Sequence, residues 1–345
     1  MICMRLKQQP GNDFMKKALL TLFISMLLLN AAYSQINIDT SALIKNNRQL
    51  YAIVVSQNDH ILYNQYFNGK NSQVLFNNQS LTKSVVSLLM GIAIDKGYIT
   101  SVDEKIVKYF PQLKQDTDKR KLDITIREVM NQASGLWHED LILLHQYISL
   151  SDPSDYTLKQ PLVSEPGKVF HYNNAASHLL SVIITKATGM STMKFARKYL
   201  FGPMNIKNVN WNKMADGYDD GSGLLSVQFP TEDMNKIGSL LLHKGYFDGK
   251  SVVPEKWIAQ ILNPTIFYNT PWGFNGSTYA LCWYHCNYQG TPVAYGLGWG
   301  GQFVFIIPAK NAVISVNESI NDMTAIKASN LFLEKIFPLI YQQLK

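Results

Sequence analysis

Hydrophobic and polar positions divide the chain into three parts. Residues 50–67 are predicted to form strand, turn and strand, because β-branched and aromatic residues alternate on either side of the polar residues 57–60. A polar loop follows, and residues 80–96 are then apolar almost all round, which indicates a buried helix that ends at Gly97. Helical periods continue through the middle of the chain, and strand-like alternation returns from residue 278 onward.

The middle of the chain is predicted to be helical and its end extended. Helical periods cover residues 175–188, 233–244, 254–262 and 323–343, and strand patterns cover residues 278–284, 293–295, 303–307 and 312–317. Strands at both ends with helices between them predict an α/β (α+β) fold. In this fold, one antiparallel sheet is built from both chain ends, is flanked by helices and carries an inserted, mostly helical lobe. We expect the sheet lobe at about 36–79 and 226–345, and the helical lobe at about 80–225.

The N-terminal region has the pattern of an export signal. Lys16 and Lys17 precede an apolar run at 18–29, and small residues follow before Gln35. This run is too short for a membrane span of about 20 residues. We therefore expect residues 1–34 to be an upstream segment and signal peptide, and residues 35–345 to be a single secreted or periplasmic domain with no membrane span. An uncleaved anchor is the alternative.

Charge and composition exclude some classes of partner. Removal of residues 1–34 takes away four basic residues and one acid, so the net charge falls from +7 to +4. No run of lysine and arginine is long enough to indicate nucleic acid as a partner. The hydrophobic content of 46% is that of an ordinary globular protein. The small-molecule substrate that we expect follows from the motifs described below, and the oligomeric state stays open.

The candidate nucleophile lies at the start of the buried helix. Ser80 and Lys83 are three residues apart and share one helix face. The first-turn N–H groups and the helix dipole favour an alkoxide at Ser80, while burial disfavours a charged lysine. A serine beside an uncharged amine is an activated nucleophile. A second Ser-x-x-Lys, at Ser191 and Lys194, opens a mixed apolar and basic segment, and we interpret it as a helix N-cap with a solvated lysine.

Two further segments could complete a catalytic site. Tyr172 and Asn174 stand two residues apart just before the 175–188 helix. Tyr172 could relay a proton, and Asn174 could donate its amide to a substrate carbonyl or to Lys83; the alternative is a helix cap with a packing tyrosine.

The second of these segments is glycine-rich. Residues 296–302 precede a strand, and glycines such as Gly298 and Gly300 would let a substrate approach the backbone closely. The backbone N–H groups of Ser80 and Trp299 could then form an oxyanion hole. The alternative is a simple β turn.

Cysteine and histidine clusters point to no metal or cofactor. Cys282 and Cys286 could form a bridge in an oxidising compartment, but two free thiols are equally compatible with the pattern. With His285 as the only further ligand, a zinc site there is disfavoured. Residues 138–140 with His145 lack the His-Glu-x-x-His spacing, which favours a solvated loop.

With these pieces in order, the chain resembles the serine hydrolase family of class C β-lactamases, penicillin-binding DD-peptidases and family VIII esterases. Besides the Ser-x-x-Lys motif, four segments are similar to family patterns in the same order. They are residues 124–136 ("I-T-I-R-x-L-L-x-x-T-S-G-L"), 166–174 ("P-G-x-x-F-x-Y-S-N"), 221–226 ("A-G-G-L-x-S") and 300–308 ("G-G-Q-x-x-x-x-x-P"). The resemblance covers nearly all of residues 35–345.

The resemblance implies Ser80 as nucleophile, Lys83 as its base, Tyr172 as proton relay and Asn174 as substrate contact. One departure matters: where the family has Lys-Thr-Gly or His-x-Gly, this chain has residues 296–298, Gly-Leu-Gly, and the cation that binds a substrate carboxylate is missing. A register shifted by three would place Trp299 first, as in some esterases.

We therefore expect an exported, metal-free serine hydrolase that works through an acyl-enzyme. Because the cation is missing, an ester or small amide ranks above a peptide as substrate, and a peptide above a β-lactam. The alternative from another class is a catalytically silent, ligand-binding homologue on the same scaffold.

Overall fold

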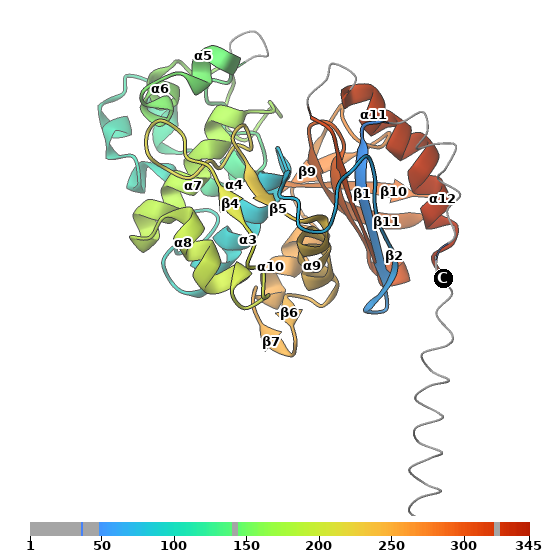
Figure 1. Ribbon diagram of the computed structural model, residues 1–345. Coiled ribbons are helices and arrows are strands. Elements are labelled where there is room, and N and C mark those ends of the chain that lie inside the picture. The colour runs from blue at the N-terminus through green and yellow to red at the C-terminus, as the bar shows by residue number, and fades with distance from the viewer. Residues whose placement is uncertain (1–35, 37–47, 140–143, 321–324) are drawn as a thin grey trace, which may run out of the picture. The chain divides into compact units, whose positions relative to one another are not determined.

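The computed structural model describes Ile36 and residues 48–139, 144–320 and 325–345 (Figure 1). The chain divides into two compact units, Met1–Asn37 and Ile38–Lys345, and the following account concerns the second. The predicted signal peptide lies outside the described residues. Among the described helices, none is both long and apolar enough to cross a membrane.

The described residues form an antiparallel sheet in the strand order β2-β1-β13-β12-β11-β10-β9-β8. These strands are β1 (Leu50–Gln57), β2 (His60–Tyr66), β8 (Tyr268–Asn269), β9 (Thr278–Ala280), β10 (Trp283–Tyr288), β11 (Thr291–Gly298), β12 (Gln302–Ile307) and β13 (Ala312–Glu318). The first strand pairs with the last, with Val54 opposite Ser315. The prediction of one sheet built from both chain ends is confirmed.

Shorter strands and the helices complete the unit. The short strands are β3 (Phe76–Asn77), β4 (Asn210–Trp211), β5 (Val227–Phe229), β6 (Tyr246–Phe247) and β7 (Lys250–Ser251). The α-helices are α3 (Leu81–Asp95), α4 (Ile126–Met130), α5 (Leu144–Ile148), α6 (Pro153–Lys159), α7 (Asn174–Thr188), α8 (Thr192–Ala196), α9 (Thr231–Leu242), α10 (Glu255–Leu262), α11 (Ala325–Leu331) and α12 (Phe337–Tyr341). Short 3₁₀ turns are η1 (Ile106–Lys108), η2 (Pro111–Gln115), η3 (Lys119–Leu122) and η5 (Pro308–Lys310), and π-helical turns are η4 (Arg197–Phe201) and η6 (Phe332–Ile336).

Helices cover both faces of the sheet, and alternate residues of β12 meet them. On one face α9 approaches closely because Gly238 has no side chain: a Cβ there would lie 3.0 Å from Val304. On the other face Phe303 and Phe305 pack against the C-terminal helices, with ring centroids 5.7 Å from Phe332 and 4.8 Å from Phe337, respectively. Both faces of β12 are therefore buried, which explains its continuous apolar sequence.

Two predicted elements are interrupted. The strand expected at 278–284 breaks between β9 and β10, where Leu281 and Cys282 adopt positive φ angles of 49° and 68°. The helix expected at 323–343 contains the π-helical turn η6 before Pro338, whose ring cannot continue regular helical hydrogen bonding. The first break depends on contacts with distant residues, since the Leu281 N–H donates to Asn131 Oδ1 and the Cys282 N–H to the Met130 oxygen. The second is visible in the sequence as Pro338.

Helix α3 lies between the helical lobe and the sheet (Figure 1). Its residues from Leu81 to Ala93 are all buried, as the apolar pattern predicted. On one side it is tied to α10, where the indole Nε1 of Trp257 donates to the carbonyl oxygen of Ser87 at 2.9 Å. A Cβ at Gly91 would lie 2.2 Å from the same indole. A glycine is therefore required at this crossing.

We expect Gly91→Ala to lower the free energy of unfolding by about 1–3 kcal/mol, because the added methyl group overlaps the Trp257 ring. Urea denaturation measures this change. Without the clash, alanine in a helix interior would instead stabilise by roughly 0.5–1 kcal/mol. The double variant with Trp257→Leu should lose less than the sum of the single losses, since the two positions are in contact.

Candidate active site

The first turn of α3 presents Ser80 differently from an ordinary cap. Ser80 occupies the N-cap position, but its hydroxyl makes no capping hydrogen bond within the described structure. Instead it accepts a hydrogen bond from Lys83 Nζ at 3.1 Å. The second motif behaves as predicted: the Ser191 hydroxyl accepts from the Lys194 backbone N–H at 3.2 Å, and the Lys194 side chain is exposed. Only the first pair brings hydroxyl and amine together.

Lys83 is buried and is surrounded by acceptors from three segments. Its side chain is 1% exposed. Besides Ser80 Oγ, its Nζ donates to Asn174 Oδ1 at 2.7 Å and to the backbone oxygen of Ser222. The Tyr172 ring lies beside it, with its centroid 4.8 Å from Nζ. A buried amine requires such partners, and here their number equals that of the hydrogens of an ammonium group.

The same arrangement orients the neutral amine. A neutral amine has two N–H groups and one lone pair. The oxygens of Asn174 and Ser222 can only accept, so they take the two N–H groups. The lone pair is then left for Ser80 Oγ, 3.1 Å away, which is within reach for proton transfer. The geometry therefore permits Lys83 to act as a base toward the Ser80 hydroxyl.

The two asparagines at the start of α7 make different contacts. Asn173 is the cap: its Oδ1 accepts from the Ala176 N–H at 2.7 Å, and its Nδ2 donates to the backbone oxygen of Leu136 at 3.0 Å. Asn174, the first residue of the helix, instead accepts a hydrogen bond from Lys83 Nζ at its Oδ1. The expectation that Asn174 donates its amide to Lys83 is wrong in direction, because the lysine donates and the amide oxygen accepts. The NH₂ group of Asn174 stays available for a substrate carbonyl.

Tyr172 stands within an aromatic group beside the amine. Its ring centroid lies 5.2 Å from that of Trp272, which is 47% exposed. Desolvation by burial, together with the neighbouring Tyr172, raises the pKa of Tyr284 well above its ordinary value. Tyr284 therefore remains a protonated phenol beside Tyr172. No sequence pattern indicates Tyr284, since it is one aromatic residue among several in β10.

The glycine-rich turn lies against the segment that leads to Ser80. A Cβ at Gly298 would lie 2.3 Å from the Asn78 oxygen, and one at Gly296 would lie 3.2 Å from Leu81 Cγ. Trp299, 41% exposed, directly follows β11, and Gly300 has a φ of 83°. The oxyanion role of the Ser80 and Trp299 N–H groups, and the substrate contacts at Gly298 and Gly300, stay predictions.

Other nucleophiles and ligands are unsuited to catalysis. Cys282 and Cys286 are free thiols in the described structure, and burial raises the pKa of each to about 12. Glu139 accepts the Ala175 N–H at 3.0 Å, and His145 is exposed. Asp140 lies outside the described residues. Over the described ranges, no group of three or more metal-ligating side chains comes together.

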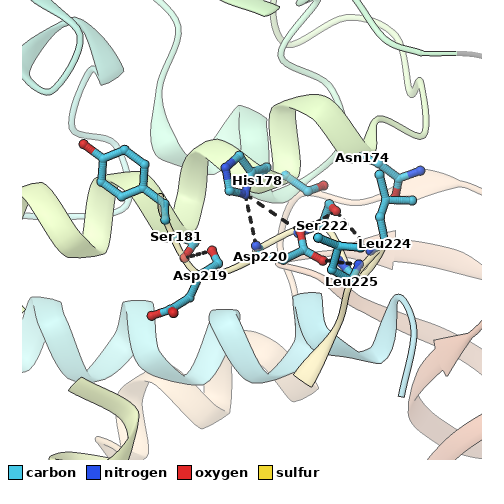
Figure 2. A network of polar contacts seen from close by, with 12 residues as sticks. Asn174, His178, Ser181, Asp219, Asp220, Ser222, Leu224 and Leu225 are labelled. Atoms are coloured by element: carbon cyan, nitrogen blue, oxygen red, sulfur yellow. Dashed lines mark hydrogen bonds and ion pairs between the residues drawn. The ribbon is translucent and has the colours of Figure 1, made fainter. Parts of the chain in front are cut away.

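The sequence also did not reveal Asp220, because Asp219, Asp220 and Gly221 have the composition of a turn. Its side chain is fully buried beneath the site, in a polar network with His178 and the segment that carries Ser222 (Figure 2). A signal was available: an aspartate followed by serine and glycine can accept successive backbone N–H groups.

Asn173→Ala and Asn174→Ala should differ in their effect on the reactivity of Ser80. We expect Asn173→Ala to lower the free energy of unfolding by about 1–2 kcal/mol through loss of the cap, with little effect on the reactivity of Ser80. Asn174→Ala should also lose some stability, because the buried amine loses a partner, but it alone should slow acylation at Ser80, by about 10–100-fold, since Lys83 loses an orienting acceptor. Urea denaturation and the rate of fluorophosphonate labelling measure the two effects. Equal effects of both variants on both readouts would contradict this division.

Comparison with known proteins places the chain. The model of the Beta-lactamase family matches residues 42–325. Beta-lactamase-like protein 4 of Dictyostelium discoideum is 29% identical over 200 residues, which cover 49% of this chain and about a third (35%) of that protein's length. The 6-aminohexanoate-dimer hydrolase of Paenarthrobacter ureafaciens is 22% identical over 255 residues, covering 68% of this chain and 64% of that protein.

Among solved structures, an octameric penicillin-binding protein homologue from Pyrococcus abyssi shares the fold. The TM-score is 0.69 at 17% identity, over 88% of this chain and 78% of the other. The mixed α/β architecture, a large antiparallel sheet flanked by helices, agrees with this likeness. Since the family model spans most of the sequence, the chain belongs to the Beta-lactamase family.

Proposed function

We propose that this protein is an exported serine hydrolase that cleaves an ester or amide bond through an acyl-enzyme. The observation that carries the proposal is the contact between Lys83 Nζ and Ser80 Oγ at 3.1 Å. The amine's two other hydrogen bonds go to Asn174 Oδ1 and the Ser222 oxygen. Membership of the Beta-lactamase family and the likeness to a 6-aminohexanoate-dimer hydrolase support it. Export rests on the pattern of residues 15–34.

In the first half-reaction Ser80 Oγ attacks the substrate carbonyl carbon and its proton passes to Lys83 Nζ. A bond forms between Oγ and carbon, and the carbonyl π electrons move to oxygen. The N–H groups of Ser80 and Trp299 would stabilise this oxyanion. As the tetrahedral intermediate collapses, the leaving group takes the proton, by way of Tyr172, whose ring lies beside Nζ. The products are an acyl-serine and a free alcohol or amine.

In the second half-reaction water attacks the acyl-serine. Lys83 accepts one proton from the water, with Tyr172 as relay, while the water oxygen forms a bond to the acyl carbon. The bond between Ser80 Oγ and this carbon then breaks, and the proton passes to Oγ, which restores the hydroxyl and releases a carboxylic acid. The proton transfers of both half-reactions use the side chains of Ser80, Lys83 and Tyr172, and the oxyanion would be held by backbone N–H groups.

The strand beside Ser80 supports a substrate without a carboxylate anchor. Gly296 occupies the position where the resembling enzymes carry a cation. A Cβ there would lie 3.1 Å from Ser84 Oγ and 3.2 Å from Leu81 Cγ, so β11 packs directly on α3. This favours simple esters and small amides over peptides and β-lactams. The exposed indoles of Trp272 and Trp299 favour an apolar group on the substrate.

A catalytically silent, ligand-binding homologue is the second candidate, and the missing cation is the observation that favours it. The two candidates differ in one property, the reactivity of Ser80. Both would bind a small molecule, but only an enzyme forms a covalent bond with an electrophile.

Intact-mass analysis after treatment with a fluorophosphonate tests this difference. We expect one phosphonyl adduct in the wild type, none in Ser80→Ala, and labelling slowed about 10²–10⁴-fold in Lys83→Ala. Ser191→Ala is the matched control, which removes the other Ser-x-x-Lys serine and should label like the wild type. An unlabelled wild type would favour the binding protein.

Substrate preference is tested with p-nitrophenyl esters, D-amino-acid amides and nitrocefin. We expect kcat/KM to be highest for the esters and to fall by about 10²-fold or more for nitrocefin, because a substrate carboxylate finds no cation at Gly296 and a lost charge-assisted contact costs about 2–3 kcal/mol. Initial rates at equal enzyme concentration measure the order. Turnover of nitrocefin above that of the esters would reverse the ranking.

A further inference from the structure

The peptide group between Ser222 and Gly223 connects the catalytic amine to a buried carboxylate. On one side its oxygen, that of Ser222, accepts from Lys83 Nζ. On the other side its N–H, that of Gly223, donates to Asp220 Oδ2 at 2.9 Å. Both polar atoms of one rigid, planar unit are therefore fixed. A rotation of this peptide would break both contacts at once.

Asp220 organises the whole segment that carries this peptide. Its carboxylate is 0% exposed. Oδ1 accepts from the Ser222 N–H at 2.7 Å and from the Ser222 hydroxyl at 2.5 Å. Oδ2 accepts from the N–H groups of Gly223, Leu225 and Ser226, at 2.9, 2.8 and 3.0 Å. Residues 222–226 thus curve around one carboxylate (Figure 2).

A buried histidine supports the same turn from α7. His178 Nδ1 accepts from the Gly221 N–H at 3.3 Å, so the proton of the neutral ring lies on Nε2. That nitrogen lies 2.9 Å from Asp216 Oδ2. The distance from Nδ1 to Asp220 Oδ1 is 3.8 Å, which exceeds a hydrogen bond. Asp220 therefore uses its lone pairs on residues 222–226, and His178 anchors the residue before them.

The segment also touches the nucleophile. A Cβ at Gly223 would lie 2.7 Å from Ser80 Cα and 2.4 Å from the Gln79 oxygen. At this separation a displacement of the backbone is transmitted to Ser80 as well as to Lys83. Close packing of this kind leaves no soft element between Asp220 and the reacting pair.

We propose that Asp220 is a positioning residue, which holds the Ser222–Gly223 peptide so that its oxygen takes one N–H of Lys83 and turns the amine's lone pair toward Ser80. This inference rests on the proposed function. The carboxylate touches neither substrate nor reacting atoms. Without it the Ser222 oxygen is free to turn away, the amine can rotate about its last bond, and its lone pair faces Ser80 for only part of the time. Acylation should slow, while substrate binding should stay.

The neighbouring aspartate offers a matched control. Asp219 is also buried, 2% exposed, and carries the same charge one residue earlier. Its Oδ2 accepts from the Met193 N–H at 2.7 Å, so it holds the start of α8 instead of residues 222–226. Asp219→Asn and Asp220→Asn each replace one buried carboxylate by an amide. In the second variant the amide NH₂ would face backbone N–H groups that it cannot bond.

The experiment compares both variants in the full chain by fluorophosphonate labelling of Ser80, p-nitrophenyl ester kinetics and urea denaturation. Rates are corrected for the folded fraction. We expect Asp220→Asn to label about 30–100-fold more slowly than the wild type, with KM within about threefold. Asp219→Asn should lose stability but label within about threefold of the wild type. Equal labelling rates in the two variants, or a loss confined to KM, would overturn the proposal.

A milder variant decides the matter if Asp220→Asn does not fold. Ser222→Ala keeps the carboxylate and removes two bonds of the hydroxyl, the one that it donates to Asp220 and the one that it accepts from the Leu224 N–H at 3.1 Å. A labelling rate reduced about 3–10-fold in folded protein supports the proposal, whereas the wild-type rate contradicts it. Labelling of the wild-type protein distinguishes a failure of the proposed function from a failure of the positioning role. If it does not label at all, the proposed function fails; if it labels and Asp220→Asn labels equally well, only the positioning role fails.

Discussion

The burial of one amine is the constraint on which the site depends. Lys83 can be held away from water only if each of its hydrogens, or its lone pair, meets a partner. Those partners come from the start of α3, from the start of α7 and from the segment after Asp220. The three segments are distant in sequence, so the site exists only when the helical lobe is assembled around α3. The same contacts that allow Lys83 to be buried also orient its amine toward Ser80.

Neighbouring elements pack closely against α3 and the residues before it because glycines stand at the contact points. Gly91, Gly223 and Gly298 each bring a neighbouring element to a distance at which a Cβ would overlap indole or backbone atoms. α3 and the residues leading to it are thus held by α10, by the segment that contains Gly223 and by β11. It also explains why a helix with no polar outer face is stable here: every direction in which it is apolar is covered.

The sequence predicted the elements whose signals are local. Helices α3 and α7 and the pairing of both chain ends follow from periodicity, from Gly97 and Gly189 as stop signals, and from the order of strands and helices. It did not predict that Asp220 would be buried, because an Asp-Asp-Gly segment has the composition of an exposed turn and only distant residues cover it. The orientation of Asn174 and the contact of Tyr284 with Tyr172 are likewise set by packing between segments. The proximity of Ser80 to Lys83 was predictable, since three residues on one helix determine it.

The pairing of β1 with β13 has a consequence for how the protein comes into being. One edge of β1 pairs with β2, which follows it directly, but the other edge pairs with β13, which ends at Glu318. A ribosome must therefore release residues 58–318 before this second edge can pair and the centre of the sheet can close. Contacts this distant in sequence also slow folding. Nascent molecules therefore expose an unpaired strand edge to chaperones until β13 has been made.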